Sequence, residues 1–242
     1  MSGHNKWSTI KHKKGRADAA RGQIFSRLVK EITVAAREGG GDPEMNARLR
    51  TAIDAAKSHN MPAQNIDRAI KRGTGEIAGV SYEEIKYEAY GPGGVAILVE
   101  VLTDNRNRAA AEIRHLLSKH NSHLGTPNSV AYIFKAVGEI RVDGSDSDED
   151  ALLEMALDAG ADDVEAEGDG SFLITTSVGS LYSIRDALES AGIPIESAER
   201  TMSPETTVIP DGRQADLALR LLEALEENED VQAVHTNLQM PD

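Results

Sequence analysis

The hydrophobic periodicity of this chain changes once, near residues 75–81, and that change limits the folds the chain can adopt. Between Gly22 and Gly73 the apolar residues recur every three to four positions, which predicts helices. Beyond Ser81, short alternating or continuous apolar runs typical of strands are interleaved with helical segments. We therefore expect an α+β protein whose amino-terminal part is entirely helical.

The segment 21–76 predicts a small domain of three helices. We expect the second helix to begin with Asp42 as its N-cap and Pro43 in its first turn, with Met45 on the buried face. Glycine commonly ends helices, so we expect the third helix to end at Gly73. The outer face of this domain is expected to carry Arg27, Lys30, Arg48, Arg50, Lys57, Arg68, Lys71 and Arg72.

The region 135–205 predicts strands and helices in the order β-α-β-β-α-β, which is that of a ferredoxin-like domain. The flanking segments, 82–134 and 206–242, supply ββα and αβ, and neither can bury a sheet alone. We expect these two segments to form one discontinuous α+β domain into which the ferredoxin-like domain is inserted. A continuous two-domain body is the alternative.

The net charge of −14 conceals a division of the chain by sign. Residues 1–80 carry 15 Lys and Arg against 8 Asp and Glu, whereas residues 81–242 carry 11 against 32. The whole positive excess lies in residues 1–30, which hold eight basic residues and one acidic residue. A basic arm on an acidic body is typical of a nucleic-acid-binding protein, and the acidic body should confine binding to one end.

We interpret residues 1–20 as a basic, flexible arm, because they show no apolar periodicity; a solvated tail is the alternative. Its cations would neutralise phosphates and release counterions. Trp7, the only tryptophan, would stack on an unpaired base, which favours RNA or single strands over the major groove. The predicted contacts in and beside this arm are Lys6, Trp7, Lys11, Lys13, Lys14, Arg16 and Arg21.

Two further groups of cations extend the predicted interface. One lies at helical spacing on one face of the third helix, where a solvated face is the alternative: Arg68, Lys71 and Arg72. The other is Arg106 and Arg108, which open a helix after a buried strand, with Asp104 as the expected N-cap. A helix N-terminus attracts anions, so one interpretation is that these two arginines bind phosphate; the alternative is that they are solvated beside the Asp104 cap.

Several classes of chemistry find no support in the sequence. There is no cysteine, which excludes disulfides and thiol catalysis and fits a reducing cytosol. No nucleophile elbow, P-loop or dinucleotide fingerprint is present, and no apolar run is long enough to span a membrane. We expect a cytoplasmic, non-enzymatic protein without metal, cofactor or small-molecule substrate; an unrecognised enzyme is a remote alternative.

Motifs along essentially the whole chain resemble those of the YebC family. They are GHNKWS at 3–8 with the following IKHKKGRADAARGQIFSRL, DPEMNARLRTAI at 42–53, NMPAQNIDRAIKRGTGE at 60–76, YEAYGPGG at 87–94 and LTDNRNR at 102–108. The chain departs from the family pattern at Asn5, where Ser is usual, and at Asn121, Ser122 and Asn128, where glycines are usual.

The resemblance implies one helical and two α/β domains, the third inserted in the second. It also implies a non-enzymatic, cytoplasmic regulator of gene expression; a mitochondrial translational activator of a cytochrome oxidase subunit belongs to the same family. Members are commonly labelled transcriptional regulators that bind DNA. The competing interpretation within the family is a ribosome-associated, RNA-binding translation factor that eases synthesis of difficult, proline-rich sequences. Composition and spacing do not choose between the two.

Overall fold

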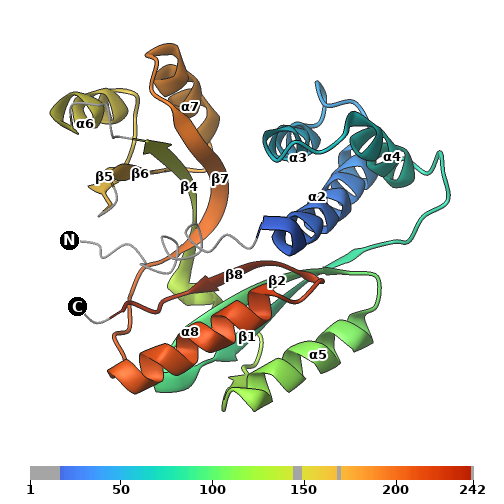
Figure 1. Ribbon diagram of the computed structural model, residues 1–242, viewed down its shortest axis with the longest axis vertical. Helices are drawn as coiled ribbons and strands as arrows, with labels where there is room; N and C mark the ends of the chain where they lie inside the picture. The colour runs from blue at the N-terminus through green and yellow to red at the C-terminus, as the bar shows by residue number, and fades with distance from the viewer. Residues whose placement is uncertain (1–16, 144–148, 168–169, 241–242) are drawn as a thin grey trace.

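The computed structural model describes residues 17–143, 149–167 and 170–240, with side chains from residue 22 onward and from 150 in the second range. Figure 1 shows three groups of elements: three helices, a sheet with two helices, and a second sheet with two helices. This arrangement confirms the expected α+β class, with the helical part at the amino-terminal end.

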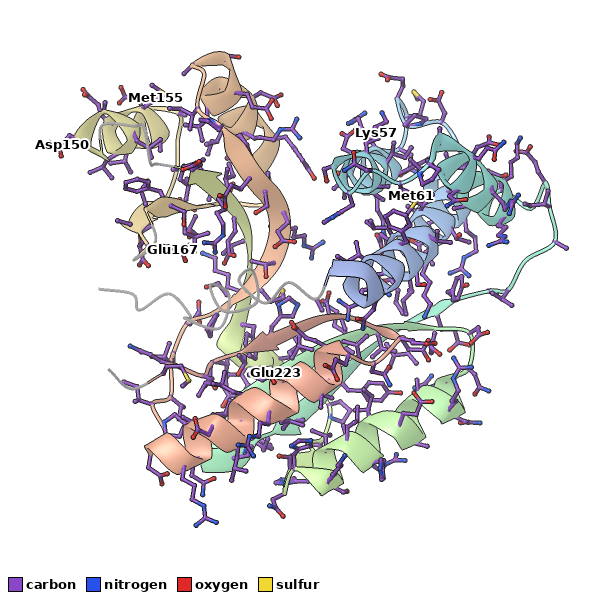
Figure 2. All side chains as sticks on the ribbon, in the orientation of Figure 1. Lys57, Met61, Asp150, Met155, Glu167 and Glu223 are labelled. Carbon is purple, nitrogen blue, oxygen red and sulfur yellow. The ribbon has the colours of Figure 1, made fainter. Side chains whose placement is uncertain are left out.

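Three helices form the first group: α2 (Ala17–Gly39), α3 (Ala47–Ser58) and α4 (Ala63–Gly73). The expected flexible arm was too long, because α2 already includes residues 17–20. Neither α2 nor any other helix in the described ranges is long and apolar enough to cross a membrane. The three helices share a core that includes Ile32, Leu49 and Met61, and Met61 lies among the helices in Figure 2.

The buried side chain of Asn46 determines where α3 begins. Its amide oxygen accepts a hydrogen bond from the N–H of Leu49 at 3.1 Å, so Asn46 is the N-cap. Its amide nitrogen donates to the carbonyls of Ala35 and Gly40, both at 2.8 Å. One side chain therefore closes the end of α2 and the start of α3.

The expectation that Asp42 caps this helix was wrong. The Asp42 carboxylate accepts a hydrogen bond from the N–H of Glu44 at 2.9 Å, within a turn that precedes the helix. Met45, expected on the buried face, lies in that turn and is 84% exposed. Asp42 is a residue type that often caps helices, and Met45 is apolar, which is why the sequence suggested these roles. Only Asn46, however, reaches the free carbonyls at the end of α2.

Gly73 ends α4 as expected, and close packing requires a glycine there. A Cβ at this position would lie 2.4 Å from the carbonyl oxygen of Thr33 in α2. The end of α4 therefore approaches the α2 backbone more closely than any other residue type would permit.

The second group is an antiparallel sheet of strand order β3-β1-β2-β8. Its helices α5 and α8 cover one face, while the first group and the second sheet lie on the opposite side (Figure 1). Both faces of the central strand β2 are consequently buried. The elements are β1 (Glu83–Tyr90), β2 (Ala96–Thr103), α5 (Arg106–Lys119), β3 (His123–Leu124), α8 (Gly212–Glu226) and β8 (Val231–Thr236).

The third group is an antiparallel sheet of strand order β5-β6-β4-β7 with two helices. The first and third strands along the chain are central neighbours, which is the ferredoxin-like arrangement predicted for β-α-β-β-α-β. The elements are β4 (Phe134–Asp143), α6 (Glu149–Asp158), β5 (Asp163–Ala166), β6 (Ser171–Thr176), α7 (Leu181–Ser190) and β7 (Ile195–Pro204).

The ferredoxin-like sheet is inserted between segments that build the other sheet. Strand β8, from the carboxyl-terminal end, pairs with β2, although the whole ferredoxin-like region separates them along the chain. This pairing supports a discontinuous domain of residues 82–134 plus 206–242 around an inserted domain of 135–205, and we propose these boundaries.

Two of the asparagines that depart from the family pattern occupy backbone positions suited to glycine. Asn121 has φ 55° and Asn128 has φ 64°, both in the left-handed region. Asparagine tolerates this region better than other non-glycine residues. Asparagine thus replaces glycine at these two turns, and the loop adds the short strand β3, which the sequence did not predict.

Candidate nucleic-acid interface

The outer face of α4 presents two cations to solvent. Arg68 and Arg72 are exposed, lie one helical turn apart, and form no ion pair with any described side chain. Lys71 beside them is held by Asp67, with 2.9 Å between Nζ and Oδ2, and this hydrogen bond raises the pKa of Lys71. Arg68 and Arg72 are therefore exposed and unpaired among the described residues, and their binding of phosphate stays a prediction.

At the start of α5, the cap differs from the expected one. Asn105 is the N-cap, and its side-chain oxygen accepts a hydrogen bond from the N–H of Arg108 at 3.1 Å. Asp104 instead pairs with the Arg108 guanidinium at 2.9 Å. Arg106 is exposed in the first turn of the helix. Asp104 is therefore a partner of Arg108 and not the cap.

The half-exposed Arg108 is engaged by carboxylates of the protein itself. Its Nη2 lies 2.8 Å from Oδ2 of Asp230, a side chain only 6% exposed. Nζ of Lys30 in α2 lies 2.7 Å from the other carboxylate oxygen, Oδ1. The hydroxyl of Thr103 donates a hydrogen bond to Oδ2 at 2.8 Å. Burial raises the pKa of Asp230, but the hydrogen bonds from Arg108, Lys30 and Thr103 outweigh it and lower that pKa. We name Asp230, Lys30, Thr103 and Arg108 the Asp230 cluster.

The surroundings of the Asp230 cluster do not suit an anion. A cavity of about 560 Å³ beside it is lined by two cations and five carboxylates: Lys30, Arg108, Asp104, Glu112, Glu227, Glu229 and Asp230. A phosphate there would face an excess of negative charge. We therefore leave Arg108 out of the candidate interface and keep Arg106.

Tyr82 lies near charged residues of α2, of α4 and of the segment before α5. Its ring centroid lies 5.8 Å from Nζ of Lys30. Burial and the Asp104 carboxylate raise the pKa of Tyr82, and the charge of Arg72 opposes them. Arg72 at the end of α4 and Asp104 before α5 therefore lie within electrostatic reach of Tyr82, whereas Arg106 lies within reach of Tyr87 in β1.

Three cations expected on the outer face of the helical group instead hold it against the first sheet. Lys30 belongs to the Asp230 cluster, and Arg27 donates to the carbonyl of Glu226 at the end of α8. Arg48 pairs with Glu31, Glu38 and Glu84, and the hydrogen bonds with Glu31 and Glu84 raise its pKa. Their partners are up to 200 residues away, so no local sequence pattern could have revealed them.

The remaining predicted contacts belong to the amino-terminal arm. Arg21 lies in α2, but its side chain is not among those described. The others lie outside the described residues and stay predictions: Lys6, Trp7, Lys11, Lys13, Lys14 and Arg16.

Two protein-family models together match almost the whole chain. Residues 5–76 match the model of the TACO1/YebC protein N-terminal domain, and residues 82–238 match that of the TACO1/YebC second and third domain. A protein of Desulfosudis oleivorans is 56% identical over 242 residues, which cover 100% of this chain and 98% of the relative. A protein of Pelotomaculum thermopropionicum is 54% identical over 244 residues, covering 100% of both. Both are named probable transcriptional regulatory protein.

Among solved structures, a conserved hypothetical protein from Aquifex aeolicus superposes with a TM-score of 0.89 at 47% identity, over 98% of each chain. Sequence and fold agree over the same length, and the resemblance noted in the motifs is confirmed: the chain belongs to the TACO1/YebC family.

Proposed function

We propose that this protein is a nucleic-acid-binding regulator of gene expression that acts without catalysis of its own. The names of its relatives describe transcriptional regulators, which supports the regulatory role. The observation that carries the nucleic-acid part is the separation of charge. Residues 1–30 hold eight basic residues and one acidic residue, whereas residues 81–242 hold 11 and 32.

The proposed interface has two parts on the helical group, and the exposed Arg106 of α5 is a further, separate contact. One part is the arm that precedes α2. The other part is Arg68 and Arg72 on α4, and the end of α4 packs against Thr33 in α2. From Ala17 to Thr33 the helix rises about 24 Å at 1.5 Å per residue. The two parts would therefore contact separate phosphates, and their contributions to the salt dependence of binding should add.

DNA is the target that the relatives' names imply, and Trp7 in the arm favours unpaired strands, including those of ribosomal RNA. A salt titration by fluorescence anisotropy on single-stranded RNA, single-stranded DNA and duplex DNA tests both. Deleting residues 1–16 removes five cations and should flatten log K against log salt by about 0.7–0.9 per lost contact.

Matched double variants test the α4 part. Arg68→Gln with Arg72→Gln should weaken binding and flatten the slope by about two contacts. Arg213→Gln with Arg220→Gln on α8 removes the same charge from another exposed surface and should change the slope little. Equal effects of the two pairs would show that only net charge matters, and no binding by the parent would overturn the proposal.

The ribosomal alternative has its own test in cell lysate. Co-migration with ribosomes on a sucrose gradient that survives DNase but not RNase would favour translation as the regulated step. Failure to co-migrate, together with binding to duplex DNA, would favour transcription.

A further inference from the structure

A cleft of about 700 Å³ lies where the three groups of elements meet. Strands β1, β2 and β8 form its floor, on the face opposite α5 and α8. Helices α2 and α3 form one wall, and β7 forms the other. Its volume is within the range of pockets that hold small organic ligands, about 300–1,000 Å³.

The floor of the cleft holds one buried amide nitrogen without a partner. The Nε2 atom of Gln232 forms no hydrogen bond with any described group. His235 on the same floor is already engaged, because its Nε2 lies 3.8 Å from a Glu100 carboxylate oxygen and its Nδ1 lies 3.4 Å from the Thr201 hydroxyl. Buried polar groups normally find partners, so the unpaired amide of Gln232 indicates a group that a ligand satisfies.

A β-bulge places Gln232 on this floor. Strand pairing passes from Glu100 with Ala233 to Val101 with Val231, which leaves Gln232 as an extra residue in β8. Bulges redirect a side chain and occur often beside functional sites. The bulge thus accounts for the presence of an unpaired amide on the floor of the cleft.

The walls of the cleft differ in character. Ala47, Thr51 and Ala55 repeat every four residues along α3, so that this wall consists of small side chains on one helix face. The opposite wall carries Arg200 and Met202 of β7. Arg200 is exposed and forms no ion pair with any described side chain.

The other two cations of the cleft are already engaged. Lys86 lies 2.7 Å from Glu100, and Arg48 is held by glutamates of α2 and β1. Within the described part of the cleft, Arg200 is therefore the cation left to meet an anionic group.

We propose that this cleft binds a single unpaired nucleotide of an RNA or DNA strand, an inference that rests on the proposed function. The wall of small side chains accommodates a planar base. The Gln232 amide hydrogen-bonds to its edge, and Arg200 pairs with the phosphate or stacks on the ring. A paired base cannot enter, because its Watson–Crick edge is occupied, so the cleft selects unpaired strands.

Calorimetric titration of the full chain with the four ribonucleoside monophosphates and their deoxy counterparts tests this site. At least one should saturate, and the comparison shows which sugar is preferred. Gln232→Met keeps the length of the side chain but removes the amide, and it should weaken binding about ten-fold or more. Arg200→Ala should do the same, whereas Arg213→Ala on the exposed start of α8 should bind as the parent does.

Two further measurements separate this site from the arm. Gln232→Met removes no charge, so its salt slope on oligonucleotides should equal that of the parent. It also removes an unsatisfied buried group, so its melting temperature should not fall. Salt-dependent oligonucleotide binding without saturation by any nucleotide, or affinities equal in all variants, would overturn the cleft site alone. Absence of all oligonucleotide binding would overturn the proposed function and the cleft site with it.

Discussion

Removing the carboxylate at the centre of the Asp230 cluster should loosen the attachment of the helical group to the first sheet. Asp230 is 6% exposed and Lys30 is 13% exposed, so Asp230→Ala leaves a largely buried ammonium without its counter-ion. Breaking a buried pair by removing one partner costs about 3–5 kcal/mol. We expect a loss near the middle of this range, since Lys30 keeps contacts with the carbonyls of Leu102 and Glu229.

Arg108→Ala provides the matched control, because it removes another member of the same cluster. Arg108 is 45% exposed, and Asp230 retains Lys30 and Thr103, so the expected cost is about 1 kcal/mol or less. Urea unfolding followed by circular dichroism measures both variants. At about 2–4 °C per kcal/mol for a chain of this length, Asp230→Ala should lower the melting temperature by about 10 °C.

The same measurements can refute this account. A cost below about 1 kcal/mol for Asp230→Ala would mean that the cluster contributes no more than a surface ion pair. Equal costs for Asp230→Ala and Arg108→Ala would mean that Lys30 does not depend on the carboxylate. Hydrogen exchange should locate the loss, with faster exchange in α2 and little change in the ferredoxin-like sheet.

Three further perturbations test other contacts. Asn46→Ala should cost about 2 kcal/mol in urea unfolding, because it removes a cap and two buried hydrogen bonds, whereas the exposed cap variant Asn105→Ala should cost about 1 kcal/mol. Gly73→Ala should destabilise through its clash with Thr33, while Gly22→Ala in α2, with open space around it, should stabilise by about 0.5–1 kcal/mol; equal effects would contradict the packing described. His235 and Lys86 lower the pKa of the Glu100 carboxyl from 4.5 to about 2, although the burial of Glu100 acts in the opposite direction. The carboxylate therefore stabilises the fold above pH 4.5, and that stability is lost as the pH falls towards 2. Glu100→Gln should remove this part of the acid dependence in unfolding measured from pH 6 to 2.

Local properties of the sequence determined the elements and their order. Helical and strand periodicities depend on neighbours within one or two turns, so most helices and strands follow from the apolar pattern alone. The order β-α-β-β-α-β was enough to predict the ferredoxin-like sheet, since few topologies accommodate it. The charge division is likewise a property of composition, and it carries the proposed function. The start of α3 was misplaced, since Asp42 and Asn46 are both capping residues and only the second meets Ala35 and Gly40.

Only the tertiary structure decided which charges are available and where a ligand fits. Lys30, Arg48 and Arg108 appear in sequence as surface cations, but their carboxylate partners come from other elements, up to 200 residues away. Ion pairing acts over a few ångströms in space and leaves no periodic signal along the chain. The cleft is hidden for the same reason, because it combines a bulge in β8, small side chains on α3 and Arg200 on β7. The sequence by itself therefore determined the elements and the sign of each region, and the fold determined which side chains remain free to act.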